Sequence, residues 1–84
     1  MIDEFTFKQQ NPEFEHCIKF EKPSRNLQFI AEVSSVLQSR LSLRINRNYK
    51  TYSDSTHHYY YFKKYEHSKF LEEWFVEREK RYQQ

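Results

Sequence analysis

The 84-residue chain contains no glycine. Glycine normally makes up about 7% of a protein, and it adopts a positive φ angle more readily than any other residue. Its absence excludes the glycine-rich turns that hold nucleotide phosphates. Left-handed backbone positions must then fall to other residues, of which asparagine and aspartate tolerate them best. We expect such turns at Asn11, Asn46, Asn48 or Asp54.

Aromatic side chains carry most of the apolar surface. The chain has 8 Phe, 7 Tyr and 1 Trp, while apolar residues as a whole reach only 37%. A chain of this length is expected to fold as one domain, residues 1–84, and it needs large side chains to fill its core. Because tyrosine is amphipathic, the same rings suit an interface. We therefore expect one small domain that a partner can complete.

The formal net charge is +2, and the basic residues are unevenly placed. Arg40, Arg44, Arg47 and Lys50 follow one another without an intervening acid. A single cysteine excludes an internal disulfide and fits a reducing compartment or organelle. The first residues have neither the charged nor the apolar region of a signal peptide, and no apolar run is long enough to cross a membrane. We expect a soluble, intracellular protein without a membrane partner.

Alternating apolar and polar residues predict four strands. They cover residues 5–9, 14–21, 41–47 and 57–64. The first two are close enough to form a hairpin. A polar loop, residues 49–56, is expected before the fourth strand.

Two helices are predicted, one after each pair of strands. Apolar residues recur at helical spacing from Leu27 through Ile30 to Leu41. Ser24 or Asn26 is the expected cap of this helix, and Ser68 is the expected cap of the last one. The order ββαββα predicts an α+β fold: a four-stranded, mainly antiparallel sheet with both helices on one face.

The residues that commonly hold metals or act as nucleophiles do not converge. They are His16, Cys17, His57, His58 and His67. The neighbours His57 and His58 fall on a predicted strand and point to opposite faces, so they cannot chelate one ion together. We expect no metal, no cofactor, no small-molecule substrate and no enzymatic activity.

Basic and amide side chains around the third predicted strand are the most informative surface feature. Arginine binds guanine and asparagine binds adenine bidentately, while lysine and arginine meet phosphates. The first predicted strand adds similar residues. The expected nucleic-acid-binding residues are Lys8, Gln10, Arg44, Asn46, Arg47, Asn48, Lys50 and Tyr52. Any solvent-facing strand is also polar, and Glu15 and Glu21 oppose phosphate. The sequence nevertheless favours a non-enzymatic module that binds DNA or RNA through this face.

The tyrosine-rich fourth strand supports an alternative. Its rings point to both faces, so that one side joins the core and the other can stack on bases or anchor a protein. The expected protein-interface residues are Tyr59, Tyr61, Tyr65 and Trp74. The alternative function is a small protein-interaction module: a phage or mobile-element type inhibitor or adaptor, or a peripheral subunit of a large complex.

The order of motifs resembles that of the LAGLIDADG homing endonucleases. The segments that carry the resemblance are residues 3–10 (DEFTFKQQ), the helix at 26–37, the strand at 60–62 and the helix with an aromatic pair at 71–75. The resemblance implies a saddle-shaped sheet that holds DNA. It implies no cleavage, because the signature helix that carries the metal-binding acid of that family has no counterpart here. The family's glycine spacing is not kept, so Asp3 and Glu4 are given no metal role.

Overall fold

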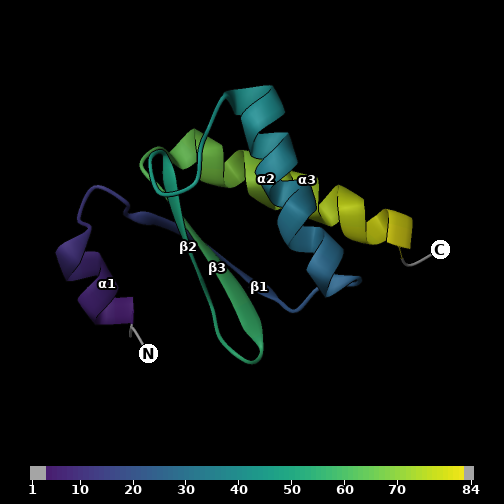
Figure 1. The fold of residues 1–84 in the computed structure, drawn as a ribbon, viewed down its shortest axis with the longest axis horizontal. Helices are drawn as coiled ribbons and strands as arrows, with labels where there is room; N and C mark the ends of the chain where they lie inside the picture. The colour runs from purple at the N-terminus through teal and green to yellow at the C-terminus, as the bar shows by residue number, and fades with distance from the viewer. Residues whose placement is uncertain (1–3, 83–84) are drawn as a thin grey trace.

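The computed structural model describes residues 4–82 of the chain (Figure 1). Its elements are helix α1 (Glu4–Gln10), strand β1 (His16–Glu21), helix α2 (Asn26–Leu41), strand β2 (Tyr49–Ser53), strand β3 (His57–Phe62) and helix α3 (Tyr65–Tyr82). The fold class is α+β, as the sequence predicts. The described residues form three strands and three helices, however, and not the predicted four strands and two helices.

Strand β3 lies at the centre of the sheet. The strand order is β1-β3-β2, and both neighbours run antiparallel to β3. The sequence of β3, HHYYYF, is rich in the aromatic residues that favour strands. Successive side chains of a strand point to opposite faces. This strand therefore presents aromatic rings to both faces of the sheet.

The inner face of the sheet, defined here as the face covered by α2 and α3, carries the main core (Figure 1). Helix α2 contributes Phe29, Val33 and Leu37, all of them fully buried. The Phe29 ring packs edge-on against Phe20 of β1 at 5.7 Å between centroids. Phe20 also lies 4.3 Å from Phe75 of α3. These rings join both helices to the sheet.

Helix α1 lies on the opposite, outer face of the sheet (Figure 1). Its Phe7 ring packs on Tyr61 of β3, 4.2 Å between centroids, and Phe14 completes this smaller cluster. The strand predicted over residues 5–9, and the hairpin it was to form with β1, are wrong. An alternation this short does not distinguish a strand from one helical turn with a buried aromatic side chain.

Residues 42–48 form a loop, so the strand predicted over residues 41–47 is also wrong. Ser42 ends α2 with a left-handed backbone, φ 57°. The Leu43 N–H reaches back to the Leu37 carbonyl at 3.1 Å, as in a Schellman helix ending. Leu43 and Leu37 both belong to the core. The alternating apolar residues that indicated a strand here serve to lock the end of a helix.

Strand β2 occupies Tyr49–Ser53, where the sequence predicted a polar loop over residues 49–56. The segment is short of apolar residues, and its strand conformation comes from pairing with β3 and from burial of Tyr49 in the core. The strands predicted over residues 14–21 and 57–64 are present as β1 and β3.

Neither α2 nor α3 begins with its predicted cap. Helix α2 follows Arg25, which has a left-handed backbone (φ 53°) and makes no side-chain cap bond. The Asn26 side chain bonds to His58 instead. Helix α3 begins at Tyr65, ahead of the predicted Ser68, whose hydroxyl donates to the Tyr65 carbonyl at 2.7 Å. The polar side chain that was predicted to cap each helix thus bonds elsewhere: the Asn26 side chain to another part of the fold, and the Ser68 hydroxyl to a carbonyl within α3.

A buried ion pair joins the two inner helices. Arg78 of α3 is fully buried, and its guanidinium pairs with Glu32 of α2 and, at 3.1 Å, with Glu79. Partial burial by itself raises the pKa of the Glu32 carboxyl. Hydrogen bonds from Arg78, Tyr82 and Gln28 outweigh that effect and hold the pKa below its ordinary value. The pair therefore stays charged at neutral pH and fixes α3 against α2.

Arg78→Met should destabilise the fold by about 3 kcal/mol, because it leaves the Glu32 carboxylate partly buried without its partner. Urea unfolding measures this. Lys80→Met, which breaks the exposed pair of Lys80 with Glu77 on the same helix, is the control and should change stability by about 0.5 kcal/mol or less. Equal losses in both variants would contradict this account.

Ser42→Gly should stabilise the chain by about 0.5–1 kcal/mol, because a glycine has no β-carbon to strain at positive φ. Ser39→Gly, in the exposed interior of the same helix, should instead destabilise by about 0.5 kcal/mol. Thermal unfolding of both variants checks the prediction. A loss of stability in both would show that Ser42 does not bear this strain.

Candidate functional site

The outer face of the sheet is only partly covered by α1. Alternation along the strands assigns eight side chains to it, beginning from Tyr61 beneath α1. They are Cys17, Lys19, Glu21, Lys50, Tyr52, His57, Tyr59 and Tyr61. Tyr61 is buried, whereas Tyr52 and Tyr59 are half-buried and Lys19 is exposed. We call Lys19, Tyr52 and Tyr59 the outer platform.

The outer platform is a row of neighbours across three strands. The register places Tyr59 between Lys19 on β1 and Tyr52 on β2. The Tyr52 and Tyr59 rings lie 5.4 Å apart between centroids, with an interplanar angle of 38°. The Lys19 Nζ atom is 5.7 Å from the centre of the Tyr59 ring. Two aromatic rings and a cation are thus held side by side on a rigid sheet.

Asp54 holds one end of this row in place. Its carboxylate accepts hydrogen bonds from the Thr56 and His57 N–H groups and, at 2.8 Å, from the Tyr59 hydroxyl. The Thr56 N–H, then Tyr59, then the His57 N–H hold the pKa of Asp54 well below its usual range. Asp54 is therefore ionised at every physiological pH, and it fixes the orientation of the Tyr59 ring.

Further cations lie next to the platform. Lys50 of β2 and Lys63 both lie over the Phe14 ring, 5.6 Å and 5.1 Å from its centre. The loop that leads into β2 exposes Arg44 and Arg47. The outer face thus combines aromatic rings with the cations Lys19 and Lys50, and Glu21 adds one negative charge to it.

The predicted nucleic-acid-binding residues fall into three groups. Lys8 and Gln10 are exposed on α1, and Lys50 and Tyr52 lie on the outer face of β2. The remaining residues, Arg44, Asn46, Arg47 and Asn48, are in the loop of residues 42–48. They form no row on a strand, because that strand does not exist. The Asn48 side chain is bonded to the Arg44 N–H at 2.9 Å, which shapes the loop.

The predicted protein-interface residues do not form one surface. Tyr59 and Tyr61 are on the outer face, and Tyr61 is covered by α1. Tyr65 is 53% exposed at the start of α3. Trp74 is half-buried on the far side of the sheet, between α3 and α2.

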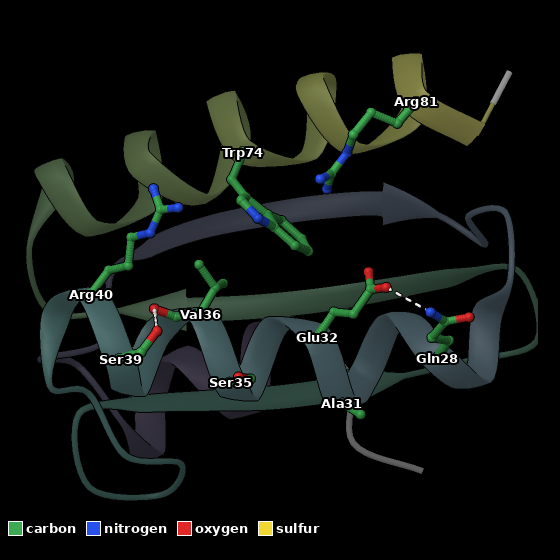
Figure 2. A pocket seen from close by; sticks show the side chains of 9 residues that line it. All are labelled: Gln28, Ala31, Glu32, Ser35, Val36, Ser39, Arg40, Trp74 and Arg81. Carbon is green, nitrogen blue, oxygen red and sulfur yellow. Dashed lines mark hydrogen bonds between the residues drawn. The ribbon is translucent and has the colours of Figure 1, made fainter. Parts of the chain in front are cut away.

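Figure 2 shows the groove in which Trp74 lies, a cavity of about 490 Å³ between α2 and α3. Trp74 points into it, with Arg40 on one side and Arg81 on the other. Its α2 wall is made largely of small or polar residues: Gln28, Ala31, Glu32, Ser35 and Ser39. Glu32 is already engaged by Gln28 at 3.0 Å and by Arg78. The groove thus has mixed charge around one indole ring.

A second groove, of about 350 Å³, separates α2 from the edge of β2. Its lining includes Leu27, Ile30 and Ile45, which are 90%, 43% and 51% exposed. The sequence placed Leu27 and Ile30 on the buried face of α2, and this is wrong. Phe29 turns into the core instead, where its ring stacks on His58 at 5.5 Å between centroids and packs edge-on against Phe20 and Phe75.

His58 closes the floor of this second groove. The Asn26 carbonyl oxygen can only accept, so His58 Nε2 carries the proton and donates to it. His58 Nδ1 then accepts from the Ser53 hydroxyl at 2.6 Å. A neutral imidazole thus ties β2 and β3 to the first turn of α2.

Lys19 and Lys63 are not among the residues predicted for a nucleic-acid site, and Tyr59 is predicted as a protein-interface residue on a strand whose outward rings can also stack on bases. The pattern of β1, with Ile18 and Phe20 facing inward, already indicated that Lys19 faces outward. What the sequence did not contain was the β1-β3-β2 order that brings Lys19, Tyr59 and Tyr52 together.

Comparisons with known protein families, curated proteins and solved structures find no match for this chain. The resemblance to LAGLIDADG homing endonucleases stays a prediction. Asp3 lies outside the described residues, and Glu4 is the first residue of α1. Among residues 4–82, no three His, Cys, Asp or Glu side chains gather to hold a metal ion. No helix in this described part has the length and apolar character to cross a membrane.

Acid should weaken the fold through His58. Burial lowers the pKa of its imidazole, Lys22 lowers it further, and Asp54 acts in the opposite direction. Because the pKa is lower in the folded than in the unfolded state, the stabilisation is complete above about pH 6.5 and is lost as pH falls through the folded value. Urea unfolding between about pH 7 and pH 5 should therefore show a smaller decline in His58→Gln.

His57→Gln, which changes the neighbouring side chain on the outer face, is the matched control and should keep the decline of the native chain. An equal decline in native chain and His58→Gln would mean that another group causes it.

Proposed function

We propose that this chain is a non-enzymatic binding protein that holds single-stranded DNA or RNA on the outer face of its sheet. The observation that carries the proposal is the outer platform: the Tyr52 and Tyr59 rings, 5.4 Å apart, beside Lys19. Aromatic rings on a sheet stack on successive bases, at about 1–3 kcal/mol per base. Lysine side chains next to them meet the phosphates.

The chemistry of the platform favours a single strand over a duplex. A ring can stack only on a base whose face is free, and a duplex hides its base faces. The cations lie mainly toward β2, where Lys50 follows the loop that exposes Arg44 and Arg47. On the β1 side, Glu15 and Glu21 stand at the two ends of the strand and repel phosphate. We infer that the backbone of the ligand follows β2 and its loop while its bases lie over the rings.

Tyr52→Leu tests the proposal, because it removes a ring whose hydroxyl makes no hydrogen bond within residues 4–82. Binding of a labelled oligonucleotide of about 15 nucleotides is followed by fluorescence anisotropy. Loss of one stacked base should weaken binding about 5- to 150-fold. The native chain should bind more weakly at about 200 mM than at about 50 mM salt, since phosphate contacts release counterions. Parallel measurements with DNA and RNA strands separate the two ligands.

Tyr65→Leu is the matched control, since Tyr65 is exposed on α3 away from the platform, and it should bind as the native chain does. The proposal is lost if no strand binds at about 50 mM salt, or if a duplex of the same sequence binds more tightly than the single strand.

A protein-interaction module is the second candidate function. The observation that favours it is the α2–α3 groove, in which Trp74 lies between Arg40 and Arg81 (Figure 2). Tryptophan and arginine are the side chains most often found at the energetic centre of protein interfaces. If a partner protein binds in this groove, Trp74→Ala should abolish its binding and Tyr52→Leu should not. Treatment of the complex with nuclease should leave the partner bound.

A further inference from the structure

Strand β2 is an edge of the sheet, and its outward backbone groups are open beyond Tyr49, which forms a bridge with Ile45 and accepts from the Asn46 N–H at 2.7 Å. The Asp54 N–H donates to the His57 carbonyl at 3.0 Å, so Asp54 and His57 are a hydrogen-bonded pair. In an antiparallel ladder such pairs alternate with pairs that are not hydrogen-bonded to each other, and the register makes Ser53–His58 and Thr51–Tyr60 pairs of the second kind. It follows that the N–H and C=O groups of Thr51 and Ser53 point away from β3. They have no backbone partner within residues 4–82. Such a row is a template for a further strand.

The surface beside this edge is apolar as well as open. The α2–β2 groove runs along β2, and its lining includes Leu27, Ile30 and Ile45. These side chains are 90%, 43% and 51% exposed, which is unusual for three large apolar residues on one side of a small domain. A partner that covers both features must therefore supply a strand for the open edge and an apolar surface for the groove.

We propose that the occupant is a second copy of this chain, paired antiparallel along β2 with the two Tyr52 residues at the two-fold axis. This register pairs Thr51 with the partner's Ser53, and Ser53 with the partner's Thr51. Every open backbone group at this edge then gains a hydrogen bond. Two three-stranded sheets become one continuous sheet.

Charge complementarity selects this register. Lys50 and Tyr52 share the outer face by strand alternation. The carboxylate of Asp54, the residue after β2, lies on the same face, because it accepts a hydrogen bond from the Tyr59 hydroxyl at 2.8 Å. With Tyr52 at the axis, each Lys50 lies opposite the partner's Asp54, and the two Tyr52 rings meet. A register centred on Lys50 would oppose two lysines and is disfavoured. The same short segment thus carries both halves of a self-complementary pair, as a two-fold interface requires.

The apolar side chains follow the same symmetry. In an antiparallel pair the start of one β2 lies beside the end of the other. The loop with Ile45 precedes β2. Leu27 lies toward the other end of β2, because His58 bonds both to Ser53 and to Asn26, the residue before Leu27. Ile45 of each copy is therefore brought toward the partner's Leu27. The pairing covers the residues that the single chain leaves exposed.

This inference is independent of the proposed function, and it extends the outer face if both hold. Across the joined sheet, Tyr59 and Tyr52 of one copy would be followed in the same row by the partner's Tyr52 and then the partner's Tyr59. A single strand of nucleic acid would then meet one longer row of rings.

Sedimentation velocity of the full chain, without nucleic acid, tests the pairing from about 1 to about 200 µM. We expect the mass of two chains at high concentration and dissociation on dilution. Thr51→Pro removes an N–H that faces away from β3, so the single chain tolerates it while the pairing does not. Thr51→Val, which keeps the N–H, is its control and should still pair.

Leu27→Lys keeps the test decisive if Thr51→Pro does not fold, because a side chain 90% exposed contributes nothing to the single chain's core. Leu27→Lys should raise the dissociation constant of the pair at least about tenfold. Val76→Lys, at an exposed position of α3, is the control and should leave the dissociation constant unchanged. A mass of one chain throughout, or pairing that survives Leu27→Lys, would overturn the proposal. Either result would leave the binding of single strands by the outer platform untouched.

Discussion

Strand β3 packs aromatic rings against both faces of the sheet at once, with Tyr60 and Phe62 inward and Tyr59 and Tyr61 outward. Burying such a strand needs cover on two sides, so helices lie on both faces (Figure 1). The long helices α2 and α3 cover the inner face, whereas the short helix α1 covers the outer face only in part. Tyr59 is half-buried as a result, and the candidate binding surface exists because α1 is too short to close it.

The lack of glycine shapes the connections between these elements. Left-handed backbone occurs at Arg25, Ser42 and Asn46 among the described residues. At Ser42, the end of α2, a glycine is the usual residue, and a packing contact offsets the strain that the serine β-carbon introduces. At Ser42 that contact is burial of Leu43 in the core. The loop that follows carries the exposed Arg44 and Arg47 and leads into β2.

Charge is divided between the two sides of the sheet. On the inner side, Arg78 is buried against Glu32 and lies over the Phe29 ring at 5.1 Å, so it serves stability. On the outer side, Lys19 and Lys50 lie over aromatic rings near the surface. Arg78 therefore holds α3 against α2, while the exposed Arg40 and Arg81 lie in the α2–α3 groove. The candidate surface that we propose for nucleic acid uses the lysines of the outer face.

The sequence by itself determined the α+β class, the strands at 14–21 and 57–64, and the two long helices, because each has a long or strongly aromatic pattern. Tertiary structure decided residues 5–9 and 41–53, where short patterns fit a strand, a helix turn or a loop equally well, and contacts with β3 and the core chose among them. It likewise chose Phe29 over Leu27 for burial. Lys50 and Tyr52 were expected at the site, but Lys19 and Tyr59 joined them only through strand order, which no local pattern encodes.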